Sequence, residues 1–263
     1  MDAKTTSHGP LRVCQFPCLK DNYGFLIRDE ASGAVAAVDT PEAVRIIEHA
    51  EALGWQVTHV LNTHWHPDHT GGNEALAERY GCAVVAPLAE ADRTPGHTRL
   101  VEPGDTVTLG ETAAQVLDVG GHTSGHIAYW FKAAGVAFVG DALFSLGCGR
   151  LFEGTPQQMW ASLKRLRTLP PETTLYCAHE YTQANAAFAV TVDPGNDALA
   201  ARKAEVERLR EAGEPTVPMR LADELPVNPF LRADAPEVAH AVGLTGAAPV
   251  DVFAEVRSRK DAF

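Results

Sequence analysis

The stretch Thr63-His64-Trp65-His66-Pro67-Asp68-His69-Thr70-Gly71-Gly72 holds three histidines and one aspartate within six residues. It follows directly on the apolar run Val57 to Leu61, which predicts a short β-strand. Imidazole and carboxylate groups are ligands of first-row metal ions. Four ionisable side chains gathered at a strand end would cost desolvation and add nothing to a core. The stretch therefore predicts a metal site at the end of a strand.

The spacing within this stretch favours two adjacent cations over one. His64 and His66 stand two apart, so in an extended chain both side chains project to the same side. Asp68 and His69 follow as the chain turns toward a helix, and they can face a second point nearby. Pro67 prevents a helix from running through the whole motif. Closed structural zinc sites are usually rich in cysteine, and none lies here, so a catalytic metal is the better interpretation.

Composition restricts the class of protein. The chain has 263 residues, 45% of them hydrophobic, which is enough for one large domain or one domain with a smaller companion. We see no apolar run near the roughly 20 residues of a membrane span, and Met1 to His8 has no signal-peptide pattern, so we expect a cytoplasmic protein without membrane contact. The net charge of -12 argues against nucleic-acid binding. Five cysteines without a CxxC pair predict buried free thiols.

The order of apolar runs predicts an α/β domain over residues 1–180 and a small, mainly helical domain over residues 181–263. In the first part, helical patterns alternate with strands expected at 25–27, 34–38, 57–61, 82–86, 107–109, 115–119, 127–131, 136–139 and 174–177. One helix is expected to be capped by Asp39 or Thr40 and to end at Gly54. Others are expected at 73–80 and 156–166, and in the second part at 182–190 and 197–212.

Three further motifs follow in order, each after an apolar run, and supply His122, Asp141 and His179. Together with the first stretch, the chain resembles the metallo-β-lactamase superfamily. The resemblance implies a four-layer αβ/βα sandwich, and it implies that Asp141 bridges two metals. One metal would be held by His64, His66 and His122. The other would be held by Asp68, His69 and His179. His126 has no ligand role in that pattern, and we expect it to pack beside the ligands.

Other segments resemble the glyoxalase II (hydroxyacylglutathione hydrolase) branch, which carries a helical second domain. They are 21–23, 147–154, 179–182, 227–232 and 256–261. The resemblance implies hydrolysis of S-D-lactoylglutathione to D-lactate and glutathione by a metal-bound hydroxide, the second step of methylglyoxal detoxification. It implies a glutathione site formed by Arg150, Phe152, Tyr181, Arg257 and Lys260. Arg150 stands where Lys also occurs in the family, and Phe152 where some members have Tyr, which removes one hydroxyl. From the residues alone, Arg257 to Lys260 would be interpreted as a solvated basic end of the chain.

Several alternatives share this ligand pattern. Asp141 stands where many lactamases have cysteine, which argues against that class, and the acidic charge argues against RNA processing. A glutathione persulfide dioxygenase of the same fold, another thioesterase or lactonase of the fold, and a non-enzymatic metal-binding module remain. We expect Asp68 and Asp141 to be the catalytic carboxylates and two divalent cations to be bound, zinc before iron or manganese. We expect a monomer whose partner is the small-molecule thioester.

Overall fold

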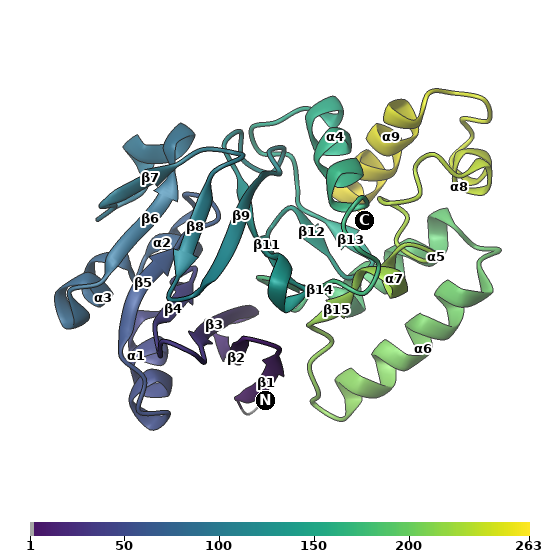
Figure 1. Cartoon of the computed structure of the whole chain (residues 1–263). Helices are drawn as coiled ribbons and strands as arrows, with labels where there is room; N and C mark the ends of the chain where they lie inside the picture. Colours follow the sequence, from purple (N-terminus) through teal and green to yellow (C-terminus); the bar gives the residue numbers. More distant parts are fainter. Residues whose placement is uncertain (1–2) are drawn as a thin grey trace. The chain divides into compact units, whose positions relative to one another are not determined.

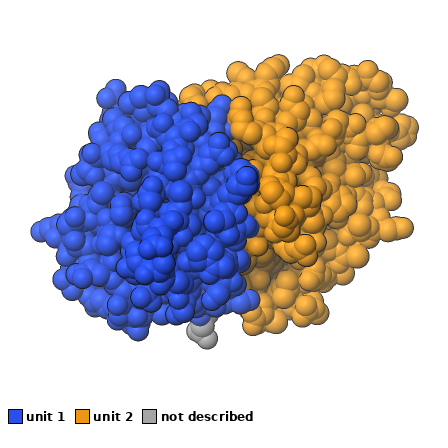
Figure 2. Space-filling model, in the orientation of Figure 1, with its two compact units in different colours: residues 1–118, 125–140 blue, residues 119–124, 141–263 orange. Residues whose placement is uncertain are grey.

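The computed structural model describes residues 3–263. Met1 and Asp2, which begin the stretch without a signal-peptide pattern, lie outside the described residues. Contacts divide the chain into two units (Figure 2). Unit 1 comprises residues 1–118 and 125–140, and unit 2 comprises residues 119–124 and 141–263. Each unit is described separately below.

The first sheet of unit 1 combines antiparallel and parallel strands. Its described strands follow the order of the chain, β1-β2-β3-β4-β5-β6-β7 (Figure 1). Neighbours from β1 to β4 are antiparallel, and those from β4 to β7 are parallel. The strands are β1 Lys4–His8, β2 Leu11–Cys18, β3 Asn22–Asp29, β4 Val35–Val38, β5 Val57–Leu61, β6 Ala83–Pro87 and β7 Arg99–Val101.

Helices α1 (Ala43–Ala52) and α3 (Asn73–Tyr80) pack on this sheet, and the short helix α2 (Pro67–Thr70) and the 3-10 turn η1 (Leu88–Arg93) connect its strands. Parallel strands need such crossovers, since a hairpin cannot join them. Ile46 of α1 and Leu76 of α3 are buried in one cluster with strand residues such as Phe16, Leu26 and Val60. Helix α3 ends at Gly81, whose left-handed φ of 65° suits glycine.

The second sheet of unit 1 is an antiparallel meander of β8 (Thr106–Leu109), β9 (Thr112–Asp118), β10 (Ile127–Phe131) and β11 (Val136–Gly140), with the turn η2 (Lys132–Ala134) before β11. Exposed and buried residues alternate along β8, as expected when one face is solvated. The ring of Phe25 in β3 meets that of Phe138 in β11 at 5.6 Å, edge to face. The two sheets of this unit therefore share a core.

Unit 2 is mainly helical. It contains α4 (Pro156–Leu166), α5 (Thr182–Val192), α6 (Asp197–Glu211), α7 (Leu221–Glu224), α8 (Pro236–Ala241) and α9 (Pro249–Ala262), with the short strands β12 (Leu143–Phe144), β13 (Gly147–Cys148), β14 (Thr174–Cys177) and β15 (Met219–Arg220) (Figure 1). Trp160 of α4 stacks on Phe253 of α9 at 6.1 Å. Phe230 packs against Phe253 and Phe188, so aromatic rings form much of this core.

The structure confirms the α/β class and the helical C-terminal part, and it confirms most of the expected elements. One expectation was wrong: the residue before the first turn of α1 is Glu42, and neither Asp39 nor Thr40 caps this helix. Strands β1 and β2 were not predicted. The five cysteines are buried and free, as expected. The division at residue 180 stays a prediction. In the described part of the chain, every helix is too short or too polar to cross a membrane.

Candidate metal centre

The end of β5 is fixed within unit 1 by bonds from neighbouring elements. Ile127 in β10 donates its backbone N–H to the carbonyl of Thr63 at 2.9 Å, and the hydroxyl of Tyr129 donates to the carbonyl of Asn62 at 2.9 Å. Asp39 accepts the backbone N–H of Thr63 at 2.8 Å. The histidine motif therefore starts from a backbone held on both sides.

Asp39 also sets the proton positions on two histidines. Its Oδ2 accepts the Thr63 hydroxyl at 2.8 Å, so that hydroxyl oxygen is left to accept from Nδ1 of His64 at 3.0 Å. Nε2 of His64 then carries a lone pair and lies 3.0 Å from Nδ1 of His66. Two ligands of one tetrahedral zinc, each about 2.0–2.1 Å from the ion, stand roughly 3.3 Å apart. The two rings thus have the spacing of ligands to one cation.

His69 is oriented by the same carboxylate. Its Nδ1 donates to Asp39 Oδ2 at 2.8 Å, which leaves Nε2 as an acceptor. That Nε2 lies 3.5 Å from Oδ2 of Asp68, which Asn22 holds by a hydrogen bond of 3.0 Å. Two acceptor atoms repel one another at this distance unless a cation lies between them. The pair has the spacing of ligands to one cation, and the presence of two cations stays a prediction.

Two further residues support the motif in unit 1. Glu90 is buried, and its carboxylate accepts the backbone N–H groups of Trp65 at 2.8 Å and Gly125 at 3.0 Å. His126 is buried and stacks on His64 with ring centroids 4.4 Å apart and planes 17° apart. This is the packing role expected for His126.

Unit 2 brings together its three predicted ligands. Nε2 of His122 and Nε2 of His179 each lie 3.4 Å from Oδ2 of Asp141. His122 donates Nδ1–H to the carbonyl of Arg150 at 2.8 Å, so its Nε2 presents a lone pair to the carboxylate. All three side chains are almost fully buried. One carboxylate oxygen equidistant from two imidazoles is the arrangement expected of a bridging ligand.

Glycines allow the close approaches around these ligands. Gly140, the last residue of β11, has a φ of 50°, and a Cβ there would lie 2.5 Å from Oγ1 of Thr63. A Cβ on Gly149 would lie 2.0 Å from the carbonyl oxygen of Asp141. Side chains at these positions would displace the backbone beside the ligands.

The residues expected to bind glutathione differ in their exposure. Phe152 is exposed, and its ring meets His122 edge to face at 5.2 Å. The guanidinium of Arg150 lies over Phe152 at 5.9 Å. Tyr181 is partly exposed and stacks on His179 at 4.7 Å, with the ring planes 5° apart. In unit 2 these three side chains adjoin metal-ligand candidates, as a substrate-binding residue should.

Arg257 and Lys260 lie on α9, and Arg257 is not part of a solvated end. Arg257 is only 6% exposed, lies over Phe230 and donates to the carbonyl of Cys148 at 3.0 Å and to Asp261 at 2.7 Å. The same Asp261 oxygen accepts from Arg150 at 3.3 Å. Lys260 donates to the carbonyl of Ala184 at 3.1 Å. Arg257 therefore has a packing role whatever it does toward a ligand.

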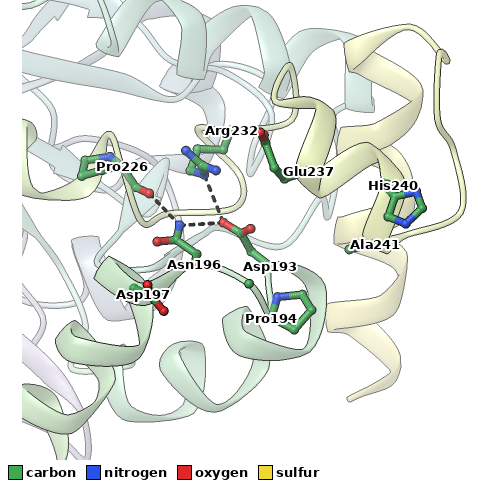
Figure 3. Close-up of a pocket in the computed structure, with 10 residues that line it drawn as sticks. Asp193, Pro194, Asn196, Asp197, Pro226, Arg232, Glu237, His240 and Ala241 are labelled. Carbon is green, nitrogen blue, oxygen red and sulfur yellow. Dashed lines mark hydrogen bonds and ion pairs between the residues drawn. The ribbon is translucent and has the colours of Figure 1, made fainter.

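Unit 2 also contains a hollow of about 820 Å³ between the α5–α6 turn and α8 (Figure 3). Its polar groups are largely paired with one another. Asp193 accepts from Arg232 at 3.1 Å and from Asn196 at 2.8 Å, and Asn196 also donates to the carbonyl of Pro226 at 2.8 Å. None of the residues expected at the functional site lines this hollow.

Sequence reasoning missed Asp39 and Glu90 as parts of the site. Asp39 has a φ of 55°, a strained value for a residue other than glycine, and such strain is common near functional sites. In the sequence, Asp39-Thr40-Pro41 has the pattern of a helix start, which conceals this role of Asp39. No local signal distinguishes Glu90 from an exposed glutamate.

Comparison with known proteins assigns families to both parts of the chain. Residues 32–179 match the metallo-beta-lactamase superfamily, and residues 180–263 match the family described as hydroxyacylglutathione hydrolase C-terminus. A hydroxyacylglutathione hydrolase of Erythrobacter litoralis is 55% identical over 96% of this chain and 100% of its own length. One from Hyphomonas neptunium is 53% identical over 96% of this chain and 98% of its own length.

Solved structures agree on the fold. The crystal structure of ETHE1 from Myxococcus xanthus aligns with a TM-score of 0.64 and 26% identity, covering 100% of this chain and 99% of the other. The BLEG-1 B3 metallo-beta-lactamase aligns with a TM-score of 0.57 and 22% identity, over 63% of this chain and 90% of its own. These likenesses confirm the predicted metallo-β-lactamase fold.

Proposed function

Because the chain belongs to the hydroxyacylglutathione hydrolase family of the metallo-beta-lactamase superfamily, we propose that it hydrolyses S-D-lactoylglutathione to D-lactate and glutathione. The observation that carries the proposal is the orientation of the imidazoles. The N–H groups of His64, His69 and His122 are directed to Thr63, Asp39 and the Arg150 carbonyl, so their other nitrogens are available as metal ligands.

We assign the ligands in the order of the superfamily pattern. One cation takes His64, His66 and His122, the other takes Asp68, His69 and His179, and Asp141 is shared. Pairs within each unit support this assignment, since their acceptor atoms face one another at 3.0–3.5 Å. The chemistry that divalent cations supply in such sites is a lowered pKa of bound water and polarisation of a carbonyl oxygen.

The protein's own residues supply orientation and proton acceptance. Asp68 is the more exposed of the two catalytic carboxylates, and Asn22 holds its Oδ2, so it can take up a proton near the attacking water. Because a thiolate is a good leaving group, the proposal needs no strong general acid. Burial raises the pKa of the Cys148 thiol to about 11 and raises that of Cys177 further, which argues against a cysteine nucleophile.

We assign the glutathione moiety to Arg150, Phe152, Tyr181, Arg257 and Lys260. Arg150 and Lys260 offer positive charge for its carboxylates, while Phe152 and Tyr181 offer apolar faces beside His122 and His179. Arg257 is almost buried, so its assignment to the ligand rests on the family resemblance rather than on its exposure. A local group of cations is needed because the net charge of -12 repels an anionic substrate.

We further propose zinc as the resident metal, with iron or manganese as alternatives, because imidazole with carboxylate suits all three. We propose a cytoplasmic monomer that binds neither nucleic acid nor membrane. The five buried thiols fit a reducing compartment, and the acidic charge fits the absence of a nucleic-acid partner.

The test is metal analysis of the purified protein together with a lactoylglutathione hydrolysis assay. We expect about two divalent cations per chain and thioester cleavage that a chelator abolishes and added metal restores. Asp141→Ala should lower metal content and turnover together, because it removes a ligand from both cations. His122→Ala should lower occupancy at one cation more than at the other.

His240→Ala provides the control, because it removes an imidazole from a position outside the site. It should leave metal content and turnover unchanged. Oxygen uptake on glutathione persulfide without thioester cleavage would contradict the proposed activity and favour a dioxygenase. Bound metal with no turnover on any ester or thioester would favour a binding module.

A further inference from the structure

The loop between β12 and β13 carries no metal ligand, yet unit 2 holds it with buried side chains from its helical part. The Ser145 hydroxyl donates to Oε1 of Glu224 at 2.6 Å, and the backbone N–H of Leu146 donates to Oε2 at 2.8 Å. Asn228 donates to the carbonyls of Phe144 at 3.0 Å and Gly147 at 3.1 Å. One hydroxyl, one backbone N–H and two carbonyls of the loop are therefore bonded to residues some 80 positions later.

The cost of this arrangement indicates that the loop conformation matters. Glu224 is 1% exposed, and its carboxylate accepts three hydrogen bonds, from Ser145, Leu146 and Asn228. Burial raises the pKa of Glu224, and the hydrogen bonds from Ser145 and Leu146 oppose that rise. Leu146 has a φ of 57°, which a leucine adopts only when its surroundings impose it.

The loop places one aromatic ring beside two residues of the site. Phe144 meets the ring of His179 at 5.9 Å and the ring of Tyr181 at 5.3 Å, both edge to face. His179 and Tyr181 in turn stack on one another. Phe144 thus supports the ligand and the substrate-facing ring from one side, and its own position depends on the clamped backbone.

We propose that Glu224 is a positioning residue that holds the Phe144–Gly147 loop so that Phe144 fixes the rings of His179 and Tyr181. This inference rests on the proposed function, since it assigns His179 to a metal and Tyr181 to the substrate. The side chain of Asn185 donates to the carbonyl of Ser145 at 3.1 Å. We call Glu224, Asn228 and Asn185 together the clamp on this loop. The helical C-terminal part thereby contributes to the reaction through the loop as well as through substrate contacts.

The first comparison is between Glu224→Ala and Glu224→Gln. Glutamine keeps an oxygen for Leu146 and Asn228 and can donate to the Ser145 hydroxyl, so it should preserve the clamp. Alanine leaves three donors without their acceptor. We expect Glu224→Ala to raise KM for lactoylglutathione roughly three- to tenfold, the equivalent of one lost aromatic contact, and to weaken metal binding against a chelator. For Glu224→Gln, both the KM and the metal affinity should stay within about twofold of the parent values.

A double-variant cycle tests the route through the ring. Phe144→Ala should reproduce the KM and metal-affinity shifts of Glu224→Ala. If the clamp acts through Phe144, the variant with both changes should be no worse than Phe144→Ala alone. Val206→Ala is the control for lost stability, because it leaves a cavity beside the buried face of α6. It should leave both the KM and the metal affinity unchanged at 25 °C. If Glu224→Ala does not fold, Asn185→Ala replaces it, with a smaller shift in the same direction.

The outcomes separate this inference from the proposed function. Independent, additive shifts, or an unchanged Phe144→Ala, would overturn the positioning role. Equal losses in Glu224→Gln and Glu224→Ala would do the same, because the role would then depend on charge rather than on the held loop. If the parent chain cleaves no glutathione thioester, the proposed function fails, while chelator competition still decides whether the clamp sets metal affinity.

Discussion

Asp39 shows how much one residue contributes at the scale of single side chains. Its carboxylate fixes the proton positions on His64, through Thr63, and on His69 directly. Asn in its place keeps the volume but has only one acceptor oxygen, so it cannot accept the Thr63 backbone N–H at one atom and the Thr63 hydroxyl and His69 N–H at the other. We therefore expect Asp39→Asn to weaken metal binding ten- to a hundredfold, the range found when a residue behind a metal ligand is lost.

Chelator competition measures this loss directly. The exposed variant Asp92→Asn removes the same charge from unit 1 and should bind metal like the parent. An Asp39→Asn protein with the parent's metal affinity would mean that the histidines are oriented by their packing alone.

Gly140 gives a second prediction for a single residue. Gly140→Ala forces a φ of 50° on a residue with Cβ and brings that Cβ to 2.5 Å from Thr63 Oγ1 and 2.7 Å from His126. Backbone strain of about 1–2 kcal/mol adds to overpacking of about 1–3 kcal/mol. Thermal unfolding should show a loss of roughly 2–5 kcal/mol.

Gly54→Ala separates the two contributions to this loss. Gly54 has a φ of 65°, but a Cβ there meets nothing within 4 Å. Only the backbone strain should appear, so the difference between the two variants measures the clash. Equal losses would place the whole effect in the backbone.

At the scale of elements, Asp29 joins the β3–β4 turn to the β8–β9 hairpin within unit 1. Burial raises the pKa of its carboxyl, but hydrogen bonds from Ser32, Thr112 and the backbone of Glu111 outweigh this and lower the pKa to about 2. A lowered pKa in the folded state adds stability above the unfolded value of about 3.9, and this contribution is lost as pH falls toward 2.

Asp29→Asn should therefore be less stable than the parent near pH 7, by about 1 kcal/mol after allowance for solvent screening. The two proteins should converge as pH falls from about 4 to about 2, since the parent then loses its carboxylate. Denaturant unfolding at a series of pH values measures both curves. A stability difference that does not change with pH would mean that the charge on Asp29 contributes nothing.

The elements also show which features a sequence can predict. The periodic helix Pro156–Leu166 and the strand Thr174–Cys177 have the predicted bounds, because their apolar patterns and their starting or flanking residues are local. Strand β1 carries mostly exposed polar residues and exists because it pairs with β2, so no local pattern reveals it. The roles of Asp39 and Glu90 cannot be predicted from the sequence for the same reason, since they depend on distant contacts. Ligand types could be predicted from motif spacing, but contacts across 25–30 residues could not.

Helix α9 carries a prediction about substrate binding. Lys260 is half-buried, and the role proposed for it lies away from the thioester. Lys260→Ala should raise KM for lactoylglutathione roughly three- to tenfold and leave kcat and metal content unchanged, because uniform binding is lost. Steady-state kinetics at two salt concentrations measures the effect, which should shrink with salt.

Lys164→Ala on α4 removes the same charge at an exposed position and controls for the overall field. Arg257→Ala should differ from Lys260→Ala by losing stability as well, because its buried contacts with the Cys148 carbonyl and Asp261 disappear. A Lys260→Ala variant with the parent's KM would remove Lys260 from the glutathione site.

At the scale of the whole molecule, the two matched families meet between residues 179 and 180, but unit 2 does not divide there. Thr174 and Leu175 of β14 pair with Arg220 and Met219 of β15. Trp160 stacks on Phe253, and Ser145 is held by Glu224. A cut at 179 would divide the core of unit 2 between the two fragments, while unit 1 would stay within the first. We therefore expect a chain of residues 180–263 made alone to lack cooperative thermal unfolding and near-ultraviolet circular dichroism, and a chain of residues 1–179 to be less stable than the intact chain.

Co-expression of the two fragments tests whether they can fold together. Because the buried groups of each fragment match those of the other, the two together should recover a folded complex and thioester cleavage, though less stable than the intact chain. Exposed aromatic surface explains why each fragment alone should also aggregate. If residues 180–263 alone unfold cooperatively with native-like near-ultraviolet dichroism, the helical part is an autonomous domain. The clamp on the Phe144–Gly147 loop would then be a contact between two separately stable bodies.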